Sequence, residues 1–279
     1  MKPDLTVGQA LRQGIELLAA HAVPEPRLTA EVLLAHALAR DRTWLYAHPE
    51  YQLSEVQWVH YGRYLYDRQN GKPTQYITRV QEFYGRPFYV TPDVLIPRPE
   101  TEHVVEAVLQ LQPPPGRILD LGTGSGAIAV SVALELARPV FASDISLNAL
   151  EIARENARRL GARVEFLCLD SGAALQGMFQ VIAANPPYVP EGEIAGLQRE
   201  IRDFEPRVAL DGGADGLNVY RKIIADAERL LVPTGHLVVE IGYRSERPLR
   251  QLLSLGAWDA IITKNDLAGL PRVMVIRRK

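Results

Sequence analysis

The stretch Asp120-Leu121-Gly122-Thr123-Gly124-Ser125-Gly126 follows a short apolar run and leads directly into the helical pattern of residues 127–137. Glycines at such a strand-to-helix bend let the backbone approach a ligand closely and adopt angles that other residues avoid. With Ala127 in place of the last glycine, the stretch also matches the dinucleotide fingerprint, and Asp144 at the end of the next apolar run would bind a ribose in either case. Three alternating glycines would lower stability if no ligand compensated for them. The sequence therefore predicts a nucleoside-containing cofactor without saying which one.

Short apolar runs alternate with helical stretches around this turn. Helical patterns such as residues 147–160 and 219–231 separate the runs. Runs of this length suit strands that are buried on both faces, so we predict a doubly wound α/β sheet, with residues 272–277 as an added edge strand. The predicted strands of the sheet are residues 117–121, 140–144, 164–169, 181–185, 236–241 and 260–263.

Asn185-Pro186-Pro187-Tyr188 comes at the carboxyl end of the fourth run, where open α/β sheets keep their ligand crevice. The prolines remove two backbone donors and restrict the chain, so that the Pro186 carbonyl and the Asn185 side-chain oxygen can both point at one NH2 group. Two acceptors would hold both hydrogens and turn the nitrogen lone pair toward an electrophilic methyl, while the Tyr188 ring lies against a planar π-system. The sulfonium of S-adenosylmethionine carries such a methyl, and nicotinamide chemistry needs no such arrangement. We therefore predict methyl transfer to a planar amide or amino nitrogen.

The amino-terminal region reads as a module of short amphipathic helices, with capping boxes at Thr6 and Ser54 and a stop at Asn70-Gly71. Eight of the eleven tyrosines precede residue 90, which suits either packing between small helices or an interaction surface. Residues 76–90 look extended around a turn and predict a linking β-hairpin. We accordingly expect a helical docking domain at residues 1–75, a hairpin linker at 76–92 and the catalytic domain at 93–279.

Composition and charge exclude several classes of protein. A net charge of −2 gives no general electrostatic reason to bind nucleic acid. The single cysteine, Cys168, cannot form an internal disulfide, fits a reducing cytosol and is expected to be a small core residue. The six histidines show no metal-ligand spacing, so we expect no metal site. Neither a secretory leader nor a membrane-spanning run is seen, so a soluble cytoplasmic protein is expected.

Five motifs together give the chain a resemblance to a known family, the release factor glutamine methyltransferases, also called PrmC or HemK. The resemblance implies a Rossmann-like, seven-stranded class I methyltransferase domain behind a helical amino-terminal domain. It also implies an S-adenosylmethionine-dependent enzyme that methylates the side-chain amide of the glutamine in the Gly-Gly-Gln motif of bacterial class I peptide chain release factors. The motifs are residues 94–102, 120–126, 185–188, 205–216 and 264–272.

The same resemblance implies roles for individual residues. The glycine turn would line the methionine and ribose parts of the cofactor, Asp144 would bind the ribose hydroxyls, and residues 170–171 would border the adenine. The expected cofactor-binding residues are Asp120, Gly122, Thr123, Gly124, Ser125, Gly126, Asp144, Asp170, Ser171 and Asn185. The expected substrate-binding residues are Asn185, Pro186, Pro187, Tyr188 and Arg98, and the expected catalytic residues are Asn185, Pro186 and Tyr188.

Arg98 and Glu240 are also open to purely structural interpretations. For Arg98 the alternative is an ion pair at a helix start, and Glu240 can be a polar residue near the crevice whose hydrogen bonds are satisfied.

The Asn-Pro-Pro-Tyr motif holds no strong base, so catalysis would depend on positioning and electrostatics.

Two other functions remain open from the sequence. One is a nucleic acid adenine-N6 or cytosine-N4 methyltransferase, which would have to flip its target base. The slight acidity of the chain and the lack of a basic stripe oppose it, and no direct contact with nucleic acid is expected. The other is a cofactor-binding scaffold without catalysis, which an intact amide-binding motif opposes.

Overall fold

The structure, a computed structural model, describes residues 5–170, 172, 174–254 and 256–279. The chain divides into two compact units. The first consists of Met1–Arg79 together with Gln198–Phe204, and the second of Val80–Leu197 and Glu205–Lys279. Residues 198–204 thus belong to the helical unit, although they lie far from it in the sequence, and the Arg68 guanidinium pairs with the Glu200 carboxylate at 2.9 Å within that unit.

The first unit is helical, as its sequence pattern predicts. Both capping boxes are present, because the Thr6 and Ser54 hydroxyls accept from backbone N–H groups three residues later and the Gln9 and Gln57 side chains reciprocate. Leucines of the second helix pack with Tyr61 in the core of this unit. The helices of this unit are α1 (Val7–Ala20), α2 (Pro26–Leu38), α3 (Arg42–Ala47), α4 (Glu55–Gln69), α5 (Thr74–Thr78) and α9 (Arg199–Phe204).

The predicted hairpin is present, but it starts later than expected. It consists of β1 (Val80–Phe83) and β2 (Arg86–Tyr89), which pair antiparallel. The extended conformation expected for residues 76–78 is wrong, because these residues end α5. Tyr76 and Ile77 are buried there, and this burial outweighs the preference of their side chains for a strand.

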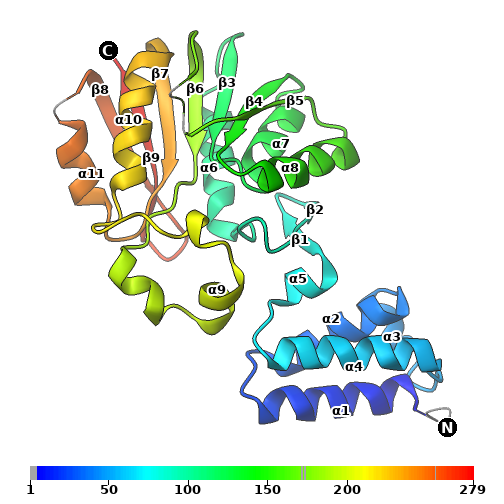
Figure 1. Cartoon of the computed structure of the whole chain (residues 1–279). Coiled ribbons are helices and arrows are strands. Elements are labelled where there is room, and N and C mark those ends of the chain that lie inside the picture. Colours follow the sequence, from blue (N-terminus) through cyan, green and yellow to red (C-terminus); the bar gives the residue numbers. More distant parts are fainter. Residues whose placement is uncertain (1–4, 171, 173, 255) are drawn as a thin grey trace. The chain divides into compact units, whose positions relative to one another are not determined.

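The second unit contains the seven-stranded sheet, in the order β5-β4-β3-β6-β7-β9-β8 (Figure 1). The strands β5, β4, β3, β6 and β7 pair in parallel, whereas β9 is antiparallel to both β7 and β8. The predicted Rossmann-like α/β fold is therefore confirmed. The strands are β3 (Arg117–Leu121), β4 (Val140–Asp144), β5 (Val164–Cys168), β6 (Phe179–Ala184), β7 (Leu231–Glu240), β8 (Trp258–Asn265) and β9 (Pro271–Arg278).

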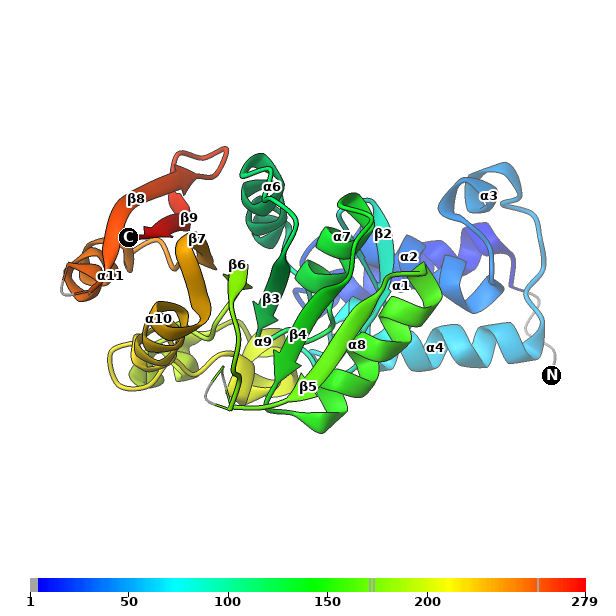
Figure 2. The same ribbon diagram turned by 90° about the horizontal axis from the view of Figure 1, so that it is seen from above.

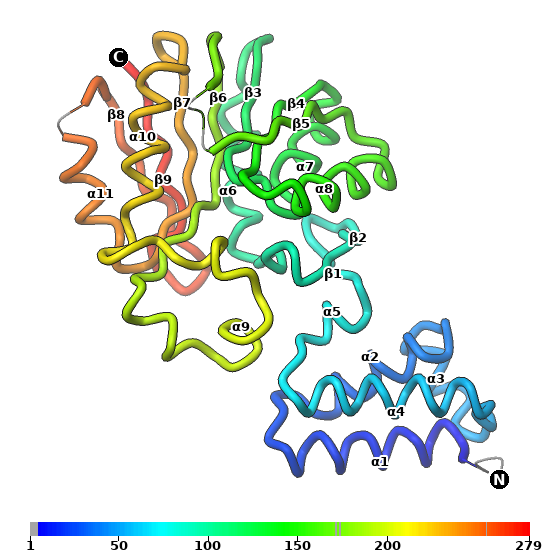
Figure 3. Tube along the Cα trace, viewed as in Figure 1, coloured from blue at the N-terminus to red at the C-terminus, as the bar shows by residue number. Residues whose placement is uncertain are grey.

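The prediction that residues 272–277 form an edge strand is wrong. They lie in β9, which runs between β7 and β8, and β8 is at the edge (Figure 3). Val273, Met274, Val275 and Ile276 are all buried, as is expected of a strand with neighbours on both sides and helices over both faces.

Two apolar layers sandwich the sheet. Along β6, Val181 and Ala183 join one core cluster, whereas Ile182 and Ala184 join the other, because successive side chains point to opposite faces. The first cluster includes residues of α6, α7 and α8, and the second residues of α10 and α11 (Figure 2). The helices of this unit are α6 (Glu102–Gln110), α7 (Ala127–Glu135), α8 (Leu147–Leu160), α10 (Asn218–Leu230) and α11 (Glu246–Leu253), with 3-10 turns η1 (Pro99–Thr101), η2 (Glu191–Gly196) and η3 (Arg207–Ala209).

Cys168 is not the small core residue that the sequence suggested. It ends β5, which lies at the opposite edge of the sheet from β8, and its side chain is exposed. Within the described part of the chain, no helix is long and apolar enough to cross a membrane.

Candidate active site

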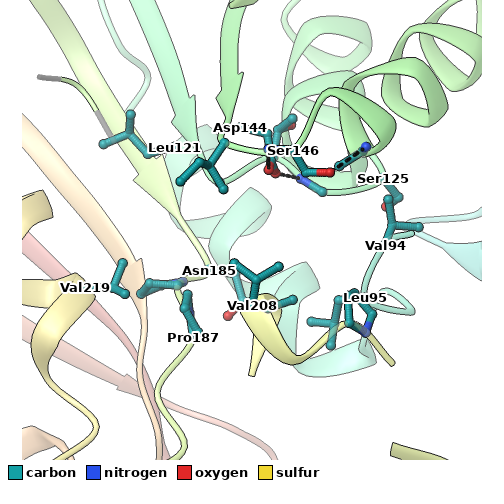
Figure 4. A pocket seen from close by; sticks show the side chains of 18 of the residues that line it. Val94, Leu95, Leu121, Ser125, Asp144, Ser146, Asn185, Pro187, Val208 and Val219 are labelled. Atoms are coloured by element: carbon teal, nitrogen blue, oxygen red, sulfur yellow. Dashed lines mark hydrogen bonds between the residues drawn. The ribbon is translucent and has the colours of Figure 1, made fainter. Parts of the chain in front are cut away.

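A cavity of about 570 Å³ lies at the carboxyl ends of the parallel strands. This volume is in the usual range for small-molecule sites, and the position is the one at which open α/β sheets bind ligands. Asp144 and Ser146 lie on one side of the cavity, and Asn185 and Pro187 lie across from them (Figure 4). The residues after β4 and after β6 therefore face the same space.

The glycine turn after β3 is shaped to admit a ligand. Gly122, Gly124 and Gly126 have φ angles of 71°, 55° and 83°, which other residues adopt only with strain. Gly122 and Gly124 line the cavity, and a Cβ added at either position would meet no protein atom within 4 Å. A Cβ on Gly126 would instead lie 3.2 Å from the Ala153 Cβ, so this glycine serves the packing of α7 on α8.

The Asp144 carboxylate, at the end of β4, organises this turn. Its Oδ2 accepts from the Gly124 N–H at 2.8 Å, and its Oδ1 accepts from the Ser146 N–H at 2.9 Å. Each carboxylate oxygen has a second lone pair, so both oxygens keep one acceptor position for a ligand. A pair of neighbouring hydroxyls, such as those of a ribose, fits this arrangement.

Asp120 supports the turn from inside the protein. The carboxylate is buried and accepts from the Thr123 hydroxyl at 2.6 Å and from the Ala129 N–H at 3.2 Å. Burial, with a smaller contribution from the charge of Asp144, raises the pKa of Asp120 to about 7, although the hydrogen bonds from Thr123 and Ala129 oppose this shift. Thr123 and Ser125 line the cavity, whereas Asp120 is not among the described residues that do, so its contact with a cofactor stays a prediction.

The Asn-Pro-Pro-Tyr motif divides between two environments. Asn185, Pro186 and Pro187 line the cavity, but Tyr188 is not among the described lining residues. The Tyr188 hydroxyl donates to Glu240 Oε1 at 3.5 Å, and burial, together with the nearby Glu240 charge, raises the pKa of Tyr188 to about 12. The predicted stacking of the Tyr188 ring on a substrate therefore stays a prediction.

A chain of hydrogen bonds runs from Asn185 into the protein. The Asn185 Nδ2 donates to the Thr101 hydroxyl at 3.0 Å, and the Thr101 hydroxyl donates to Glu240 Oε2 at 2.6 Å. Glu240 is 2% exposed, and burial raises its pKa to about 7. The Tyr220 hydroxyl donates to the Glu240 backbone carbonyl at 2.8 Å. Sequence reasoning placed Glu240 near the crevice but missed Thr101, which lies 84 residues before Asn185.

Arg98 makes an ion pair within the catalytic unit. Its guanidinium donates to the buried carboxylate of Glu205 at 2.5 Å, and the same carboxylate accepts from the Ile96 N–H at 3.3 Å. The neighbouring Pro97 lines the cavity, whereas Arg98 is not among the described lining residues. The pair thus ties the wall at residues 93–97 to the segment before η3, and substrate binding by Arg98 stays a prediction.

The end of the cavity expected to hold adenine is more exposed. Asp170 lines the cavity and pairs with Lys222 at 2.9 Å, and both side chains are 56% exposed. Ser171, the other expected adenine contact, lies outside the described residues. Apolar side chains supply much of the remaining wall, and several of them lie outside the motifs seen in the sequence. They include Val94, Leu95, Ile145, Val208, Val219 and Ile223.

No cluster of three or more His, Cys, Asp or Glu side chains placed to hold a metal ion is found among residues 5–170, 172, 174–254 and 256–279.

Comparison with known proteins gives two family models and many relatives. Residues 9–78 match the PrmC N-terminal domain, and residues 101–201 match the methyltransferase small domain. Two relatives named release factor glutamine methyltransferase cover nearly the whole chain. The protein from Koribacter versatilis is 43% identical over 98% of this chain and 99% of its own, and that from Moorella thermoacetica is 44% identical over 99% of both. Among solved structures, the 16S rRNA N2 G1207 methyltransferase of T. thermophilus, in complex with AdoMet and guanosine, aligns with a TM-score of 0.53 at 18% identity over 72% of this chain and 50% of that chain, which supports the fold alone.

Proposed function

Because this chain belongs to the release factor glutamine methyltransferase family, we propose that it transfers a methyl group from S-adenosylmethionine to a side-chain amide of a class I release factor. The acceptor would be the glutamine of the Gly-Gly-Gln motif, and the product would be N5-methylglutamine. The release factor is thus the proposed protein partner.

One observation carries this proposal: a single cavity has the glycine turn and Asp144 on one side and the Asn-Pro-Pro motif on the other. A cofactor seated on the glycine turn and a substrate amide at Asn185 would share about 570 Å³ of space. Neighbouring sites of this kind let the two reactants meet in a defined orientation, and this positioning can account for a large part of a rate enhancement.

The residues present fit S-adenosylmethionine. Asp144 has acceptor positions for ribose hydroxyls, Gly122 and Gly124 leave room beside the backbone, and Val94 with Leu95 supplies apolar wall. When bound, the cofactor supplies an electrophilic methyl on a sulfonium. The contacts of Asp170 and Ser171 with adenine are part of the proposal.

The chain's own residues would hold and polarise the acceptor amide. Asn185 Oδ1 and the Pro186 carbonyl would accept the two hydrogens of the amide NH2, which orients the nitrogen toward the cofactor side of the cavity. Both oxygens also stabilise the positive character that develops on the nitrogen, more in the transition state than in the ground state. Because the motif contains no strong base, the proton would leave to water after transfer.

A methyl-transfer assay with three acceptors tests the proposal. Purified release factor, the same factor with its motif glutamine replaced, and DNA would each be incubated with the protein and labelled S-adenosylmethionine. Label in the first acceptor alone is the expected result. Label in DNA but not in the factor would overturn the substrate, and cofactor binding without transfer to any acceptor would favour a scaffold.

A further inference from the structure

The hydrogen-bond chain behind Asn185 has a direction that chemistry imposes. When Glu240 is ionised, its carboxylate can only accept, so the single proton of the Thr101 hydroxyl points to Glu240 at 2.6 Å. The hydroxyl can then only accept from Asn185, and the atom that Asn185 turns toward it must be Nδ2, at 3.0 Å. Because Asn185 lines the cavity, its Oδ1 becomes the amide atom available to a ligand.

We propose that Thr101 and Glu240 are positioning residues for methyl transfer: they fix the orientation of the Asn185 amide so that its oxygen, and not its NH2, meets the acceptor nitrogen. This inference rests on the proposed function. An Asn side chain turned by 180° would present donors to a substrate NH2, and two donors facing each other cannot bind. The hydrogen-bonded relay from Glu240 through Thr101 to Asn185 therefore decides whether the site holds an amide at all.

Burial strengthens the control that Thr101 and Glu240 exert on the orientation of the Asn185 amide. Thr101 is 4% exposed and Glu240 is 2% exposed, so water has little access to compete for their hydrogen bonds. Thr101 lies in η1 and Glu240 ends β7, which pairs with β6, and Asn185 directly follows β6. Three separate segments thus converge on one side-chain amide.

The relay also predicts a dependence on pH. A protonated Glu240 could donate to the Thr101 hydroxyl, which would then be free to donate to Asn185 and reverse the amide. The pKa of Glu240 is raised to about 7: burial and the charge of Glu100 raise it, and the hydrogen bonds from Thr101 and Tyr188 and the charge of Arg272 partly offset them. The Tyr220 hydroxyl donates to the backbone carbonyl of Glu240 and also lies within electrostatic range of the Glu240 carboxylate. Turnover is therefore expected to rise as the pH increases through the range in which Glu240 ionises.

Substitutions at Thr101 test the proposal through turnover. Thr101→Val keeps the shape but removes the hydroxyl, and it should lower kcat for the release factor by roughly ten- to a hundredfold, because a misplaced acceptor group has a cost of this size. The Kd for S-adenosylmethionine should stay near that of the wild type. Thr101→Ser restores the hydroxyl and should recover most of the turnover.

A matched control is available at the edge of the same sheet. The Thr263 hydroxyl donates to Glu246 Oε1 at 2.7 Å and accepts from the Arg250 guanidinium at 2.8 Å, so Thr263→Val removes the same pair of bonds away from the cavity. It should leave kcat unchanged. If Thr101→Val keeps wild-type kcat, or if Thr101→Ser fails to recover it in a folded protein, the relay is refuted while the proposed function stands.

A second readout needs no activity. Hydrogen exchange of the Asn185 side-chain amide, followed by NMR on the full chain and assigned by its loss in Asn185→Ala, should be slow in the wild type and in Thr101→Ser. It should be at least about tenfold faster in Thr101→Val, since a lost hydrogen bond of about 1.4 kcal/mol changes an equilibrium tenfold. Equal exchange in all three proteins would refute the relay even if the wild type methylates no release factor. If the wild type methylates no release factor but the exchange rates differ as expected, only the proposed function is refuted.

Discussion

Replacing Asp144 by Asn is expected to weaken binding of S-adenosylmethionine strongly, because this carboxylate serves both the glycine turn and the ligand. Its two oxygens accept backbone N–H groups from Gly124 at 2.8 Å and from Ser146 at 2.9 Å. An Asn side chain has only one acceptor oxygen, so its NH2 would face one of these donors. It would also lose one of the two positions proposed for the ribose hydroxyls.

The magnitude follows from the number of bonds affected. A hydrogen bond to a charged group contributes roughly 1.5–3 kcal/mol, against about 1 kcal/mol for a neutral one. One charge-assisted bond in the turn is lost, the other becomes neutral, and one ligand contact disappears. We expect binding to weaken by about 2–4 kcal/mol, which corresponds to roughly 30- to 1,000-fold in Kd.

Isothermal titration calorimetry with S-adenosylmethionine and with its demethylated product measures this effect directly. Asp41→Asn is a suitable control, because Asp41 accepts from the Trp44 N–H at 2.7 Å as the N-cap of α3 in the helical unit and its loss removes the same charge. Binding by folded Asp144→Asn at nearly wild-type Kd would refute the assigned role of Asp144.

Three further predictions concern the site and its scaffold. Asn185→Ala should lower kcat far more than it changes the Kd for S-adenosylmethionine, and equal losses in both, measured by steady-state kinetics and calorimetry, would contradict its role as an acceptor. Gly126→Ala should lower the free energy of unfolding by about 1–2 kcal/mol, because φ there is 83° and the new Cβ would crowd Ala153; an unchanged urea midpoint would show that the turn relaxes. Burial raises the pKa of Glu240 from 4.5 to about 7, so its contribution to stability is complete below about pH 4.5 and is lost as the pH rises through 7. This loss amounts to about 3 kcal/mol, and Glu240→Gln should flatten the fall in urea-unfolding free energy between these pH values; an equally steep fall would refute the assignment.

Local patterns predicted the parallel part of the sheet well. Strands such as β3 and β4 are short apolar runs between helices, and their burial on both faces leaves a continuous signal in the sequence. The position of β9 between β7 and β8 left no such signal, because the order of antiparallel strands depends on long-range pairing. The exposure of Cys168 has the same origin, since β5 is an edge strand only by virtue of the strand order.

Both halves of the candidate site could be predicted from the sequence for the same physical reason. The glycine turn and the Asn-Pro-Pro motif each depend on local backbone conformation, so the residues that each needs are neighbours in the sequence. Thr101 and Glu240 act on Asn185 only through side chains that the fold brings together from 84 and 55 residues away (185 − 101 and 240 − 185). Such contacts depend on tertiary structure and leave no local pattern.

The most direct test of the account is the position of the methyl group after incubation of the protein with a class I release factor and S-adenosylmethionine. Tandem mass spectrometry of the digested factor should find one added methyl on the side-chain amide nitrogen of the Gly-Gly-Gln glutamine, and none when Asn185→Ala replaces the wild type. A methyl group on any other atom of the factor, or undiminished transfer by Asn185→Ala, would contradict the proposal that two neighbouring oxygens hold the acceptor amide.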